Sequence, residues 1–531
     1  MSKPELEPEI RTLVDISQSE AALAGQADMV LEQARWAAQV FQRYDRATTQ
    51  AIVRAVAEVA HAKAADYAAR AVEETGFGVV AHKQIKNELT ALPLVAHYAD
   101  WDFVNPKVKA AEKIVEIPRP AGVVFALTPS TNPIATLYFK VLAALMTRNA
   151  IIVSPHPAAL AVSLEAAAAL CEAAEAAGAP PAVIQVVEQP SLPLIDQYMR
   201  SPKVDVILAT GGLAMVRAAY SSSNPAIGVG PGNAPVYVDP SADLGAAAKL
   251  IVESKSFDNS ILCTNESVLI TQAESEKALL REMKRAGAHL CDAEETERLR
   301  RLLFHARGFN VEMLGCDAVW IAEQAGIKVP AKTKVLLTPI HLIGVDEPLS
   351  REKLCPVLGV YVARSEAQAL MQARQLLRFG GAGHSAAIHA SDQRVILDYA
   401  AAVEVYRVVV NAPCSQGAAG FATHLSPSFT IGTGFFGRSS LGENIGPQHL
   451  VQWTRVAWHK DSKAMLDDRR LTQLTHPGPL PEAPSDGVPG KTRASGHHPA
   501  PRPAPSRPAD GDLRDEIRKI IAEELRAALR K

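Results

Sequence analysis

The sequence predicts an α/β fold with two regions that each contain a β-sheet. Two observations carry this prediction. Short apolar runs that end in turn residues alternate with helical stretches over residues 123–212, and a second alternation runs from about 235 to 435. Strand–helix alternation of this kind is typical of parallel sheets covered by helices. The length of 531 residues, at roughly 100–200 residues per domain, agrees with two or three domains.

The first region begins with helices and continues with four strands. Residues 25–100 carry apolar residues at helical spacing, which predicts amphipathic helices. Strands are expected at 123–130, 150–156, 182–188 and 204–212, with helices at 133–147 and 157–178. Ligands of such folds bind at the carboxyl ends of the strands, where the segments TPSTNP, SPHP and TGG lie.

The second region predicts another α/β domain. Its clearest strands are VLLTPIHLIGV (335–345), VLGVYVA (357–363), AAIHA (386–390) and VYRVVVNAP (405–413). After about residue 436 the segment HLVQWTRVAW (449–458) alternates apolar and polar residues, which predicts an edge strand.

The C-terminal tail differs in composition from the rest of the chain. Residues 475–511 contain ten prolines with Gly, Ser and His, a composition that cannot build a core and predicts a disordered linker. Residues 512–531 predict a short amphipathic helix. Asp512 can cap the start of this helix, and its apolar face consists of Leu513, Ile517, Ile520, Ile521, Leu525, Ala528 and Leu529.

Bulk composition excludes several classes of protein. The net charge of -2 gives no reason to expect nucleic acid or anionic lipid as a partner. We expect no apolar run near the roughly 20 residues that span a bilayer, and the first residues show no signal peptide. The cysteines are widely spaced and form no CxxC pair, which predicts a reduced cytoplasmic protein without disulfides or a metal site.

Cys263 is the candidate nucleophile. It lies in SKSFDNSILCTNESVLI, where polar residues precede it and apolar residues follow, as expected for a loop that delivers a thiol to a cleft before a buried strand. An isolated cysteine is more often a small core residue. We assign that role to Cys171, Cys291 and Cys316, while Cys355 and Cys414 lie in loops near the expected site.

The motifs around Cys263 occur in a recognisable order. They are LTPSTNP (127–133), IIVSPHP (151–157), ATGG (209–212), GVGPGN (228–233), SKSFDNSILCTNE (254–266), EKLCPV (352–357), GAGHSAAIH (381–389) and NAPCSQGAAG (411–420). From about 100 to 455 the chain resembles the aldehyde dehydrogenase superfamily, and most closely its CoA-acylating branch.

The resemblance implies a division of the chain into domains. It implies a Rossmann-type NAD-binding domain at 1–234, a catalytic domain at 235–435, and a return segment at 436–474. Residues 110–120 and 445–460 then form a β-arm that makes dimers in this superfamily, so we expect a homo-oligomer, dimer or tetramer. The sequence ends without the iron-dependent alcohol dehydrogenase half of bifunctional relatives, so onward reduction to alcohol is not expected.

The resemblance also implies roles in catalysis. The Cys263 thiolate attacks the aldehyde, hydride leaves to NAD(P)+, and the resulting thioester passes its acyl group to CoA. Asn132 matches the side-chain donor to the oxyanion, with the Cys263 backbone N–H as the second donor. Without this context, Asn132 reads as a turn residue before Pro133. His384 resembles a histidine of the acylating branch that could accept the CoA thiol proton, or it lines the substrate site.

An absent glutamate favours CoA as the acyl acceptor. Hydrolytic members carry a general-base glutamate in a segment like ELGGK, whereas the matching segment here, GVGPGNAP (228–235), has no acidic residue. Water then attacks the thioester poorly, although a base from elsewhere in the fold would change this. A hydrolytic dehydrogenase and a non-catalytic scaffold remain the alternative hypotheses.

Several residues are candidates for cofactor binding. The segment Ser154-Pro155-His156-Pro157 stands where many hydrolytic relatives have Lys-Pro-x-Glu, and Glu352 matches a glutamate that contacts the nicotinamide ribose. We expect NAD, with NADP not excluded. Gly-Gly after a strand can place N–H groups near a pyrophosphate, or it forms a simple turn. The expected cofactor-binding residues are Thr128, Pro129, Ser154, His156, Gly211, Gly212 and Glu352.

The linker and terminal helix resemble the encapsulation peptides of enzymes packaged in bacterial microcompartments. This implies shell proteins as partners and the lumen of a microcompartment as the location. A coiled-coil segment or a membrane-surface helix is the alternative. Acetaldehyde and propanal are the expected substrates. The segment GTGFFGRSSLGENIGPQHL also resembles sulfoacetaldehyde dehydrogenases, which leaves a polar aldehyde open.

Overall fold

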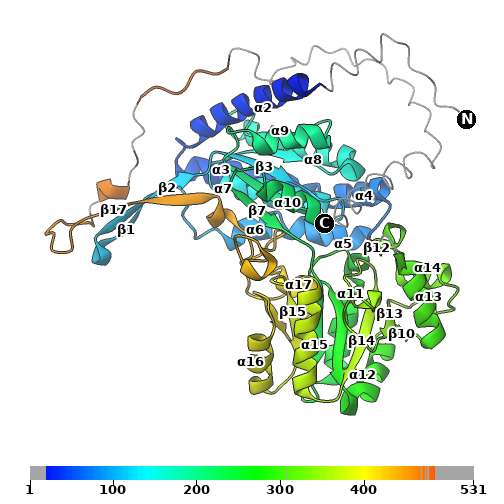
Figure 1. Ribbon diagram of the computed structural model, residues 1–531. Helices are drawn as coiled ribbons and strands as arrows, with labels where there is room; N and C mark the ends of the chain where they lie inside the picture. Colours follow the sequence, from blue (N-terminus) through cyan, green and yellow to red (C-terminus); the bar gives the residue numbers. More distant parts are fainter. Residues whose placement is uncertain (1–18, 306–307, 468, 473, 475–477, 485–531) are drawn as a thin grey trace, which may run out of the picture.

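The computed structural model describes residues 19–305, 308–467, 469–472, 474 and 478–484. Figure 1 shows two α/β bodies, one above the other, and a long β-arm that leaves the upper body to one side. The upper body contains the N-terminal helices and a five-stranded sheet, and the lower body contains a seven-stranded sheet. The predicted α/β class is confirmed.

From residue 19, where the description begins, to residue 97, five helices precede the first sheet, as the apolar spacing of residues 25–100 predicts. Two of them start at a capping side chain, because Ser19 accepts a hydrogen bond from the N–H of Ala22 and Asp45 from that of Thr48. Such caps satisfy N–H groups of the first helical turn. The helices are α2 (Glu20–Phe41), α3 (Arg46–Ala62), α4 (Ala64–Thr75), α5 (Val80–Leu89) and α6 (Leu92–His97).

The five-stranded sheet is parallel throughout, with the strand order β5-β4-β3-β6-β7. Every residue of β3 and β4 is buried, which explains their continuous apolar sequences. The chain order reverses between β3 and β6, the position where parallel sheets form ligand crevices. The strands are β3 (Val123–Leu127), β4 (Ala150–Ser154), β5 (Ile184–Val186), β6 (Val206–Thr210) and β7 (Ala226–Val229), and the strands expected in this region are confirmed.

Helices cover this sheet and complete the larger core. They are α7 (Pro133–Met146), the short η2 (Pro157–Ala159), α8 (Leu160–Ala176), α9 (Leu192–Arg200) and α10 (Leu213–Tyr220). All residues of α7 are buried, including Lys140, whose ammonium donates hydrogen bonds to the carbonyls of Leu127 and Leu208 at 2.6 and 2.9 Å. The expected helices at 133–147 and 157–178 are confirmed.

The expectation that no apolar segment approaches the length of a membrane span is wrong. The helix Pro157–Ala176 is 20 residues long and apolar enough to span a membrane by length and composition. In the structure it packs against the core through Val162, Ala166 and Leu170. The alanines that raise its mean hydropathy also let it pack closely against the sheet, so we interpret it as a core helix.

The seven-stranded sheet is also parallel, with the order β10-β13-β14-β9-β8-β15-β16. Val236 and Val238 pack on one face and Tyr237 on the other, so both faces are covered. The strands are β8 (Ala234–Val238), β9 (Glu266–Gln272), β10 (Ala288–Leu290), β13 (Val335–Pro339), β14 (Val357–Ala363), β15 (Ala386–His389) and β16 (Val408–Val410).

Helices and short elements surround this second sheet. The helices are α11 (Leu244–Ser256), α12 (Ala273–Arg285), α13 (Ala293–Leu303), α14 (Ala318–Gln324), α15 (Glu366–Phe379), α16 (Gln393–Ala402) and α17 (Cys414–Ala418). The short elements are η3 (Phe257–Ser260), β11 (Phe304–His305), β12 (Gly308–Phe309), η4 (Val311–Met313), η5 (Pro348–Ser350), η6 (Phe435–Gly437) and η7 (Pro447–His449).

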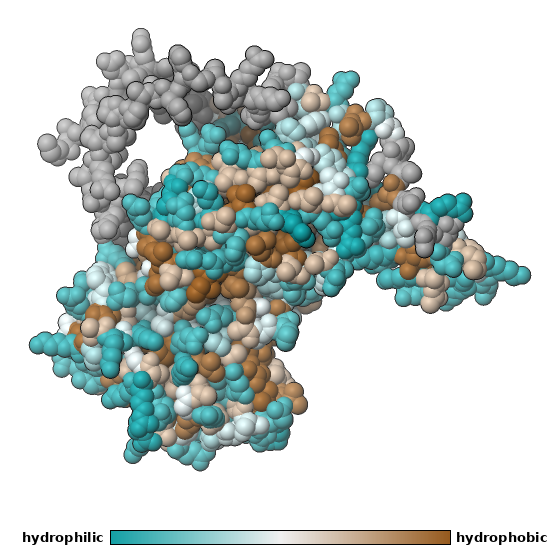
Figure 2. Space-filling view, turned by 180° about the vertical axis from the view of Figure 1, so that it is seen from behind, coloured by the Kyte–Doolittle hydropathy of each residue, from teal (hydrophilic) through white to brown (hydrophobic). Residues whose placement is uncertain are grey.

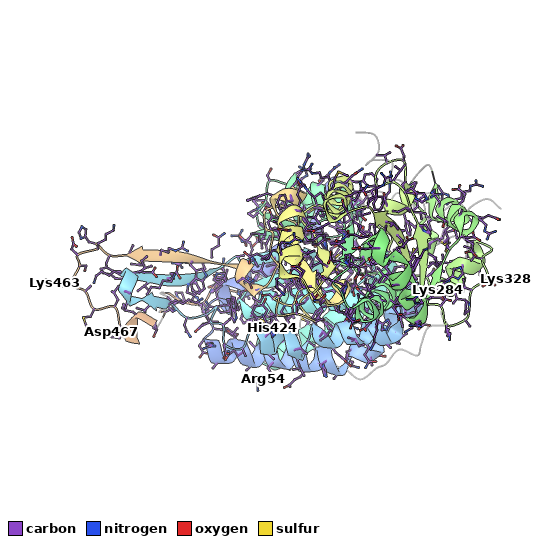
Figure 3. The ribbon with its side chains drawn as sticks, turned by 90° about the horizontal axis from the view of Figure 1, so that it is seen from below. Arg54, Lys284, Lys328, His424, Lys463 and Asp467 are labelled. Carbon is purple, nitrogen blue, oxygen red and sulfur yellow. The ribbon has the colours of Figure 1, made fainter. Side chains whose placement is uncertain are left out.

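The arm is a three-stranded antiparallel sheet in the order β1-β2-β17. It consists of β1 (Lys107–Lys109), η1 (Ala110–Glu112), β2 (Ile114–Pro120), β17 (Val451–Ala457) and η8 (Arg469–Thr472). β17 lies at the edge of this sheet, as its alternation predicts. Lys463 and Asp467 mark the far end of the arm, opposite Lys284 and Lys328 (Figure 3), and the tip is hydrophilic (Figure 2).

The C-terminal tail is described only in part. Residues 478–484 lie along α2, where Trp36 Nε1 donates a hydrogen bond to the carbonyl of Pro481 at 3.0 Å and Arg43 donates one to that of Gly478 at 3.1 Å. The rest of the predicted linker 475–511 and the predicted helix 512–531 lie outside the described residues.

Candidate active site

A cavity of about 660 Å³ lies between the two bodies, at the carboxyl ends of β3, β4 and β6. Most of the residues expected from the sequence line it, although they come from distant parts of the chain. They are Thr128, Pro129, Asn132, Ser154, His156, Gly211, Gly212, Cys263 and Glu352. His384 is the one expected site residue that does not line it.

Cys263 follows a turn with unusual backbone geometry. Asp258, Asn259 and Ser260 have φ angles of 50°, 50° and 68°, a left-handed conformation that costs non-glycine residues about 1–3 kcal/mol each. The surrounding structure holds the turn in place, because Asn259 Nδ2 donates to the carbonyl of Gly315 at 2.9 Å. Strain of this kind clusters at active sites, and here it presents the thiol to the cavity.

The surroundings of Cys263 disfavour its thiolate. Burial raises the pKa of the thiol to about 12, with a smaller contribution from the Glu352 carboxylate, while Arg407 and Lys86 act in the opposite direction. The thiol is therefore protonated at neutral pH. Because the thiolate is the attacking species, the protein needs positive charge or hydrogen-bond donors near the sulfur when it reacts.

Asn132 lies at the start of α7 with its amide at the edge of the cavity. Asn132 Nδ2 donates to the carbonyl of Ile261 at 3.0 Å and contacts Thr131 Oγ1 at 3.4 Å. Its Oδ1 accepts a hydrogen bond from the ammonium of Lys86. Asn132 and Cys263 thus face one cavity, the arrangement that an oxyanion site beside a nucleophile requires.

A buried group of charges that was not expected from the sequence lies behind Asn132. Lys83 and Lys86 of α5 both contact the Asp258 carboxylate, and all three residues are at most 3% exposed. The sequence does contain a signal, because two lysines at positions i and i+3 share one face of a helix. Lysines at this spacing usually lie on a solvated helix face, so only the fold shows that Lys83 and Lys86 are buried.

Glu352 and Gly232 occupy the wall beside Cys263. The backbone N–H of Gly232 donates to Glu352 Oε1 at 3.2 Å. Burial raises the pKa of Glu352 to about 8, so the carboxyl is mostly protonated at neutral pH. A Cβ on Gly232 would collide with the carbonyl oxygen of Cys263, which explains why a glycine stands there.

His384 lies behind this wall. A Cβ on Gly232 would be 3.4 Å from its ring, so His384 is adjacent to the Cys263 backbone. Its Nδ1 is 2.9 Å from Ser385 Oγ, and none of the residues that the structure describes forms a hydrogen bond with its buried Nε2. Burial lowers the pKa of His384 to about 3, with Arg407 acting in the same direction, so the ring is neutral at neutral pH.

The opposite end of the cavity offers hydrogen-bonding groups that a cofactor could use. Two buried hydroxyls at the ends of β3 and β4, Thr128 Oγ1 and Ser154 Oγ, have no hydrogen-bond partner in the described part of the chain and are available to a ligand. His156 Nδ1 accepts the N–H of Ala158 at 3.1 Å, which fixes the ring at the rim. Cβ atoms on Gly211 and Gly212 would meet nothing within 4 Å, which leaves the start of α10 open.

The other cysteines do not line the cavity. Cys291, Cys355 and Cys414 are buried, and Cys414 begins α17, where its N–H donates to Glu266 Oε1 at 3.1 Å. Cys171 packs in α8 with its Sγ 3.5 Å from the carbonyl of Ile184. These contacts support the expected structural roles.

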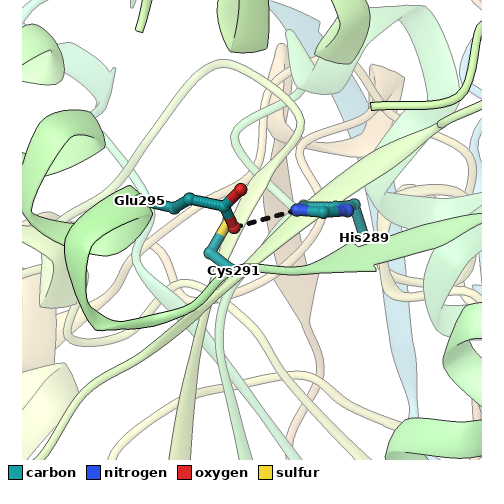
Figure 4. A group of neighbouring side chains, drawn as sticks. All are labelled: His289, Cys291 and Glu295. Carbon is teal, nitrogen blue, oxygen red and sulfur yellow. Dashed lines mark hydrogen bonds and ion pairs between the residues drawn. The ribbon is translucent and has the colours of Figure 1, made fainter. Parts of the chain in front are cut away.

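One cysteine belongs to a group whose ligand atoms lie close enough together to hold a metal ion, which the sequence did not lead us to expect. Ligand atoms of His289, Cys291 and Glu295 lie within 4.8 Å of one another (Figure 4). Glu295 also belongs to the capping box of α13, because its Oε2 accepts the N–H of Asp292 at 3.1 Å. The same Oε2 lies 3.0 Å from His289 Nε2. Cys291 packs in the core, so we interpret the group as a helix cap.

Comparison with known sequences identifies relatives of this chain. Residues 7–298 match the model of the aldehyde dehydrogenase family. An aldehyde-alcohol dehydrogenase of Clostridium acetobutylicum is 38% identical over 80% of this chain and 49% of its own length. The chain thus spans about half the length of such relatives. The acetylating succinate-semialdehyde dehydrogenase of Clostridium kluyveri is 35% identical over 82% of this chain and 96% of its own.

Solved structures resemble this fold closely. An acetylating aldehyde dehydrogenase from Geobacillus thermoglucosidasius is 37% identical, with a TM-score of 0.81 over 83% of this chain and 98% of its own. A propionaldehyde dehydrogenase from the fucose utilisation microcompartment of Clostridium phytofermentans is 29% identical, with a TM-score of 0.75 over 82% of this chain and 98% of its own. The propionaldehyde dehydrogenase of Rhodopseudomonas palustris, solved with bound CoA and an acylated cysteine, is 28% identical. Its TM-score is 0.75 over 82% of this chain and 97% of its own.

Proposed function

Because the chain belongs to the aldehyde dehydrogenase family, we propose that it oxidises a short-chain aldehyde to the acyl-CoA with NAD+ and CoA, through a thioester on Cys263. Relatives named as acetylating enzymes support this proposal, as does the neighbour solved with CoA and an acylated cysteine.

In the first half-reaction, the Cys263 thiol loses its proton to solvent and the resulting thiolate bonds to the aldehyde carbon, so that the carbonyl oxygen becomes an oxyanion. Asn132 Nδ2 donates a hydrogen bond to that oxygen, and preorganised donors of this kind are worth about 3–4 kcal/mol each. NAD+ supplies a hydride acceptor when bound. Loss of hydride from the former aldehyde carbon restores the C=O bond and leaves a thioester on Cys263.

In the second half-reaction, the CoA sulfur attacks the thioester carbon and Cys263 leaves as a thiolate. We propose that His384 accepts the CoA thiol proton, because Nε2 has no hydrogen-bond partner among the described residues. Burial lowers the pKa of the ring, so the imidazolium is short-lived and passes the proton on. The role requires the bound thiol to reach Nε2 through the wall beside Gly232. The proton is then released, so that aldehyde, NAD+ and CoA give acyl-CoA, NADH and H+.

One observation carries the choice of CoA over water as acyl acceptor. The segment 228–235 contains no acidic residue, and Glu352, the acidic residue that lines the described cavity, is mostly protonated at neutral pH because burial raises its pKa to about 8. A protonated carboxyl cannot take a proton from water. A general base contributes about 10²- to 10⁴-fold to such a step, so hydrolysis of the thioester is slow.

The lining of the cavity supports an uncharged aldehyde and NAD. None of the described residues that line it is Lys or Arg. A sulfonate on the substrate, or the 2′-phosphate of NADP, would therefore lack a cationic partner there. We propose acetaldehyde or propanal as substrate and NAD as cofactor, and comparison of kcat/KM with sulfoacetaldehyde and with NADP+ tests both choices.

The decisive experiment is omission of CoA. At neutral pH, the steady-state rate of NADH formation from propanal and NAD+ should fall by about 100-fold or more without CoA, because no base activates water. A single turnover of NADH per Cys263 should remain, since acylation does not need CoA. Sustained NADH formation without CoA, with free acid as product, would instead identify a hydrolytic dehydrogenase, and no activity with CoA would favour a scaffold.

We also propose a homo-oligomer that assembles through the arm. β17 is hydrogen-bonded to β2 on one side and is the edge of its sheet, and its Val456 is 39% exposed. An exposed strand edge is a ready template for pairing with another chain. The arm therefore supports a dimer or larger assembly.

We further propose that the cytoplasmic enzyme enters a microcompartment through residues 512–531. Deletion of everything after residue 475 should leave kcat within about twofold, since the cavity residues precede it, but abolish co-purification with shell proteins. A matched control keeps the length and replaces Ile517, Ile521 and Leu525 of the apolar face with Glu. If the truncated enzyme still enters shells at the level of the parent, targeting by the tail is rejected.

A further inference from the structure

A buried group of three charged side chains connects helix α5, the turn before Cys263 and the Asn132 loop. Lys86 is 2% exposed, Lys83 3% and Asp258 0%. Burial lowers the pKa of both lysines, so holding them here as ammonium groups costs free energy. Groups of this kind are kept in a core only where their contacts compensate for desolvation.

The two lysines share one carboxylate but differ in their second contact. Lys86 Nζ donates to Asp258 Oδ2 and to Asn132 Oδ1. Lys83 Nζ donates to Asp258 Oδ2 at 3.3 Å and to the backbone carbonyl of Thr131 at 2.9 Å. The backbone N–H of Val79 also donates to Asp258, at 2.6 Å. Lys86 is therefore the member of the group that touches the Asn132 side chain.

This contact determines which way the Asn132 amide points. An ammonium group has three donors and no acceptor, so the atom of Asn132 that faces Lys86 must be Oδ1. Nδ2 then faces the cavity, where the carbonyl of Ile261 holds one N–H at 3.0 Å. The other N–H has only a 3.4 Å contact with Thr131 Oγ1, so it remains available to a substrate oxygen.

We propose that Lys86 is a positioning residue that holds the Asn132 amide with its N–H groups toward the oxyanion formed on Cys263. Asp258 anchors the Lys86 ammonium, because it accepts hydrogen bonds from both lysines and is itself fixed in the left-handed turn before the nucleophile. The Lys86 side chain thus aligns the turn before the nucleophile with the oxyanion donor, because it contacts both Asp258 and Asn132. The positive charge of Lys86 also favours the Cys263 thiolate.

This role rests on the proposed attack of Cys263 on an aldehyde, but not on the identity of the acyl acceptor. Lys86→Met keeps the shape of the side chain and removes the donor, so the amide of Asn132 can flip. We expect kcat with propanal, NAD+ and CoA to fall by about 10- to 100-fold, less than the about 10²- to 10³-fold loss when an oxyanion donor is removed. KM for propanal should change by less than about threefold.

A double-mutant cycle with Asn132→Ala separates positioning from a general structural effect. In the Asn132→Ala protein, Lys86→Met should change kcat by less than about threefold, because no amide remains to be oriented. Lys83→Met is the matched control, since it removes an equally buried lysine from Asp258 but no contact with the Asn132 side chain. Its effect on kcat should be the same in the parent and in Asn132→Ala.

Additive effects of Lys86→Met and Asn132→Ala would overturn the positioning role while leaving the proposed function intact. Loss of CoA-dependent NADH formation in the parent would reject the proposed function instead. If circular dichroism shows that Lys86→Met does not fold, Lys86→Gln replaces it in the cycle. A glutamine amide can donate or accept, so it no longer dictates the orientation of Asn132, and the same non-additivity is expected.

Discussion

Replacement of Cys263 by alanine is expected to lower kcat by at least about 10⁴-fold, the scale of loss when a covalent nucleophile is removed. No other cysteine lines the described cavity, so no second thiol can take over the attack. The measurement is NADH formation with propanal, NAD+ and CoA. In the parent without CoA, mass spectrometry should find one acyl group, attached to Cys263.

Cys171→Ala is the matched control for this prediction. Cys171 packs in α8 outside the cavity, so kcat should stay within about twofold of the parent. Residual activity of Cys263→Ala above about a tenth of the parent would mean that another group forms the covalent bond. An acyl group found on any other residue would have the same consequence.

Alkylation of Cys263 in the enzyme without ligands should accelerate about tenfold per pH unit between pH 7 and 10. Burial raises the pKa of this thiol to about 12, so the pH lies below the pKa throughout this range and the thiolate fraction grows tenfold with each unit. The expected increase approaches about 1000-fold overall, reduced only by the Glu352 carboxylate that forms above pH 8. The inactivation rate with iodoacetamide, measured at several pH values, tests this directly.

Glu352→Gln provides a control with a different pH dependence. The pKa of Glu352 is about 8, so its carboxyl is neutral below that pH and the two proteins should then react at similar rates. Above pH 8 the parent carries a carboxylate that disfavours the thiolate, and the variant should react faster. A rate that levels off near pH 8 or 9 in the parent would contradict the raised pKa of Cys263.

The electrostatics of the cavity connect these predictions to the proposed function. Burial keeps Glu352 protonated and holds the Cys263 thiol in its neutral form at neutral pH. The same desolvation that makes Glu352 a poor base for water makes the thiolate costly until charges or donors are in place. Lys86 and Arg407 both act in the direction of the thiolate, which is why their burial matters for catalysis.

Most of the fold was predictable because its signals are local. Apolar runs such as 150–156 are buried on both faces of a parallel sheet, and the apolar spacing within 25–100 reflects helices with one face in the core. Tertiary packing explains two segments that composition alone describes incorrectly. The Ala-rich helix Pro157–Ala176 passes for a membrane span by composition, and residues 478–484 of the expected linker lie along α2.

The candidate site was predictable where residue type alone carries the chemistry. Nine of the ten expected site residues line one cavity, because strand ends and motif order place them there. His384 lies behind Gly232 instead. A sequence motif does not show how deeply a side chain is buried behind the cavity wall. Lys83 and Lys86 resemble ordinary surface lysines in the sequence, and their partner Asp258 is 172 residues from Lys86.

The sequence by itself determined the α/β class, the thiol at Cys263 and the absence of an acid in 228–235, since these depend on residue identity and local periodicity. Only the tertiary structure decided which charges are buried and how they are paired. A pKa depends on the water that the fold removes and on the charges it brings near. The protonation of Glu352, the neutral ring of His384 and the Lys86 contact that orients Asn132 therefore come from three-dimensional packing.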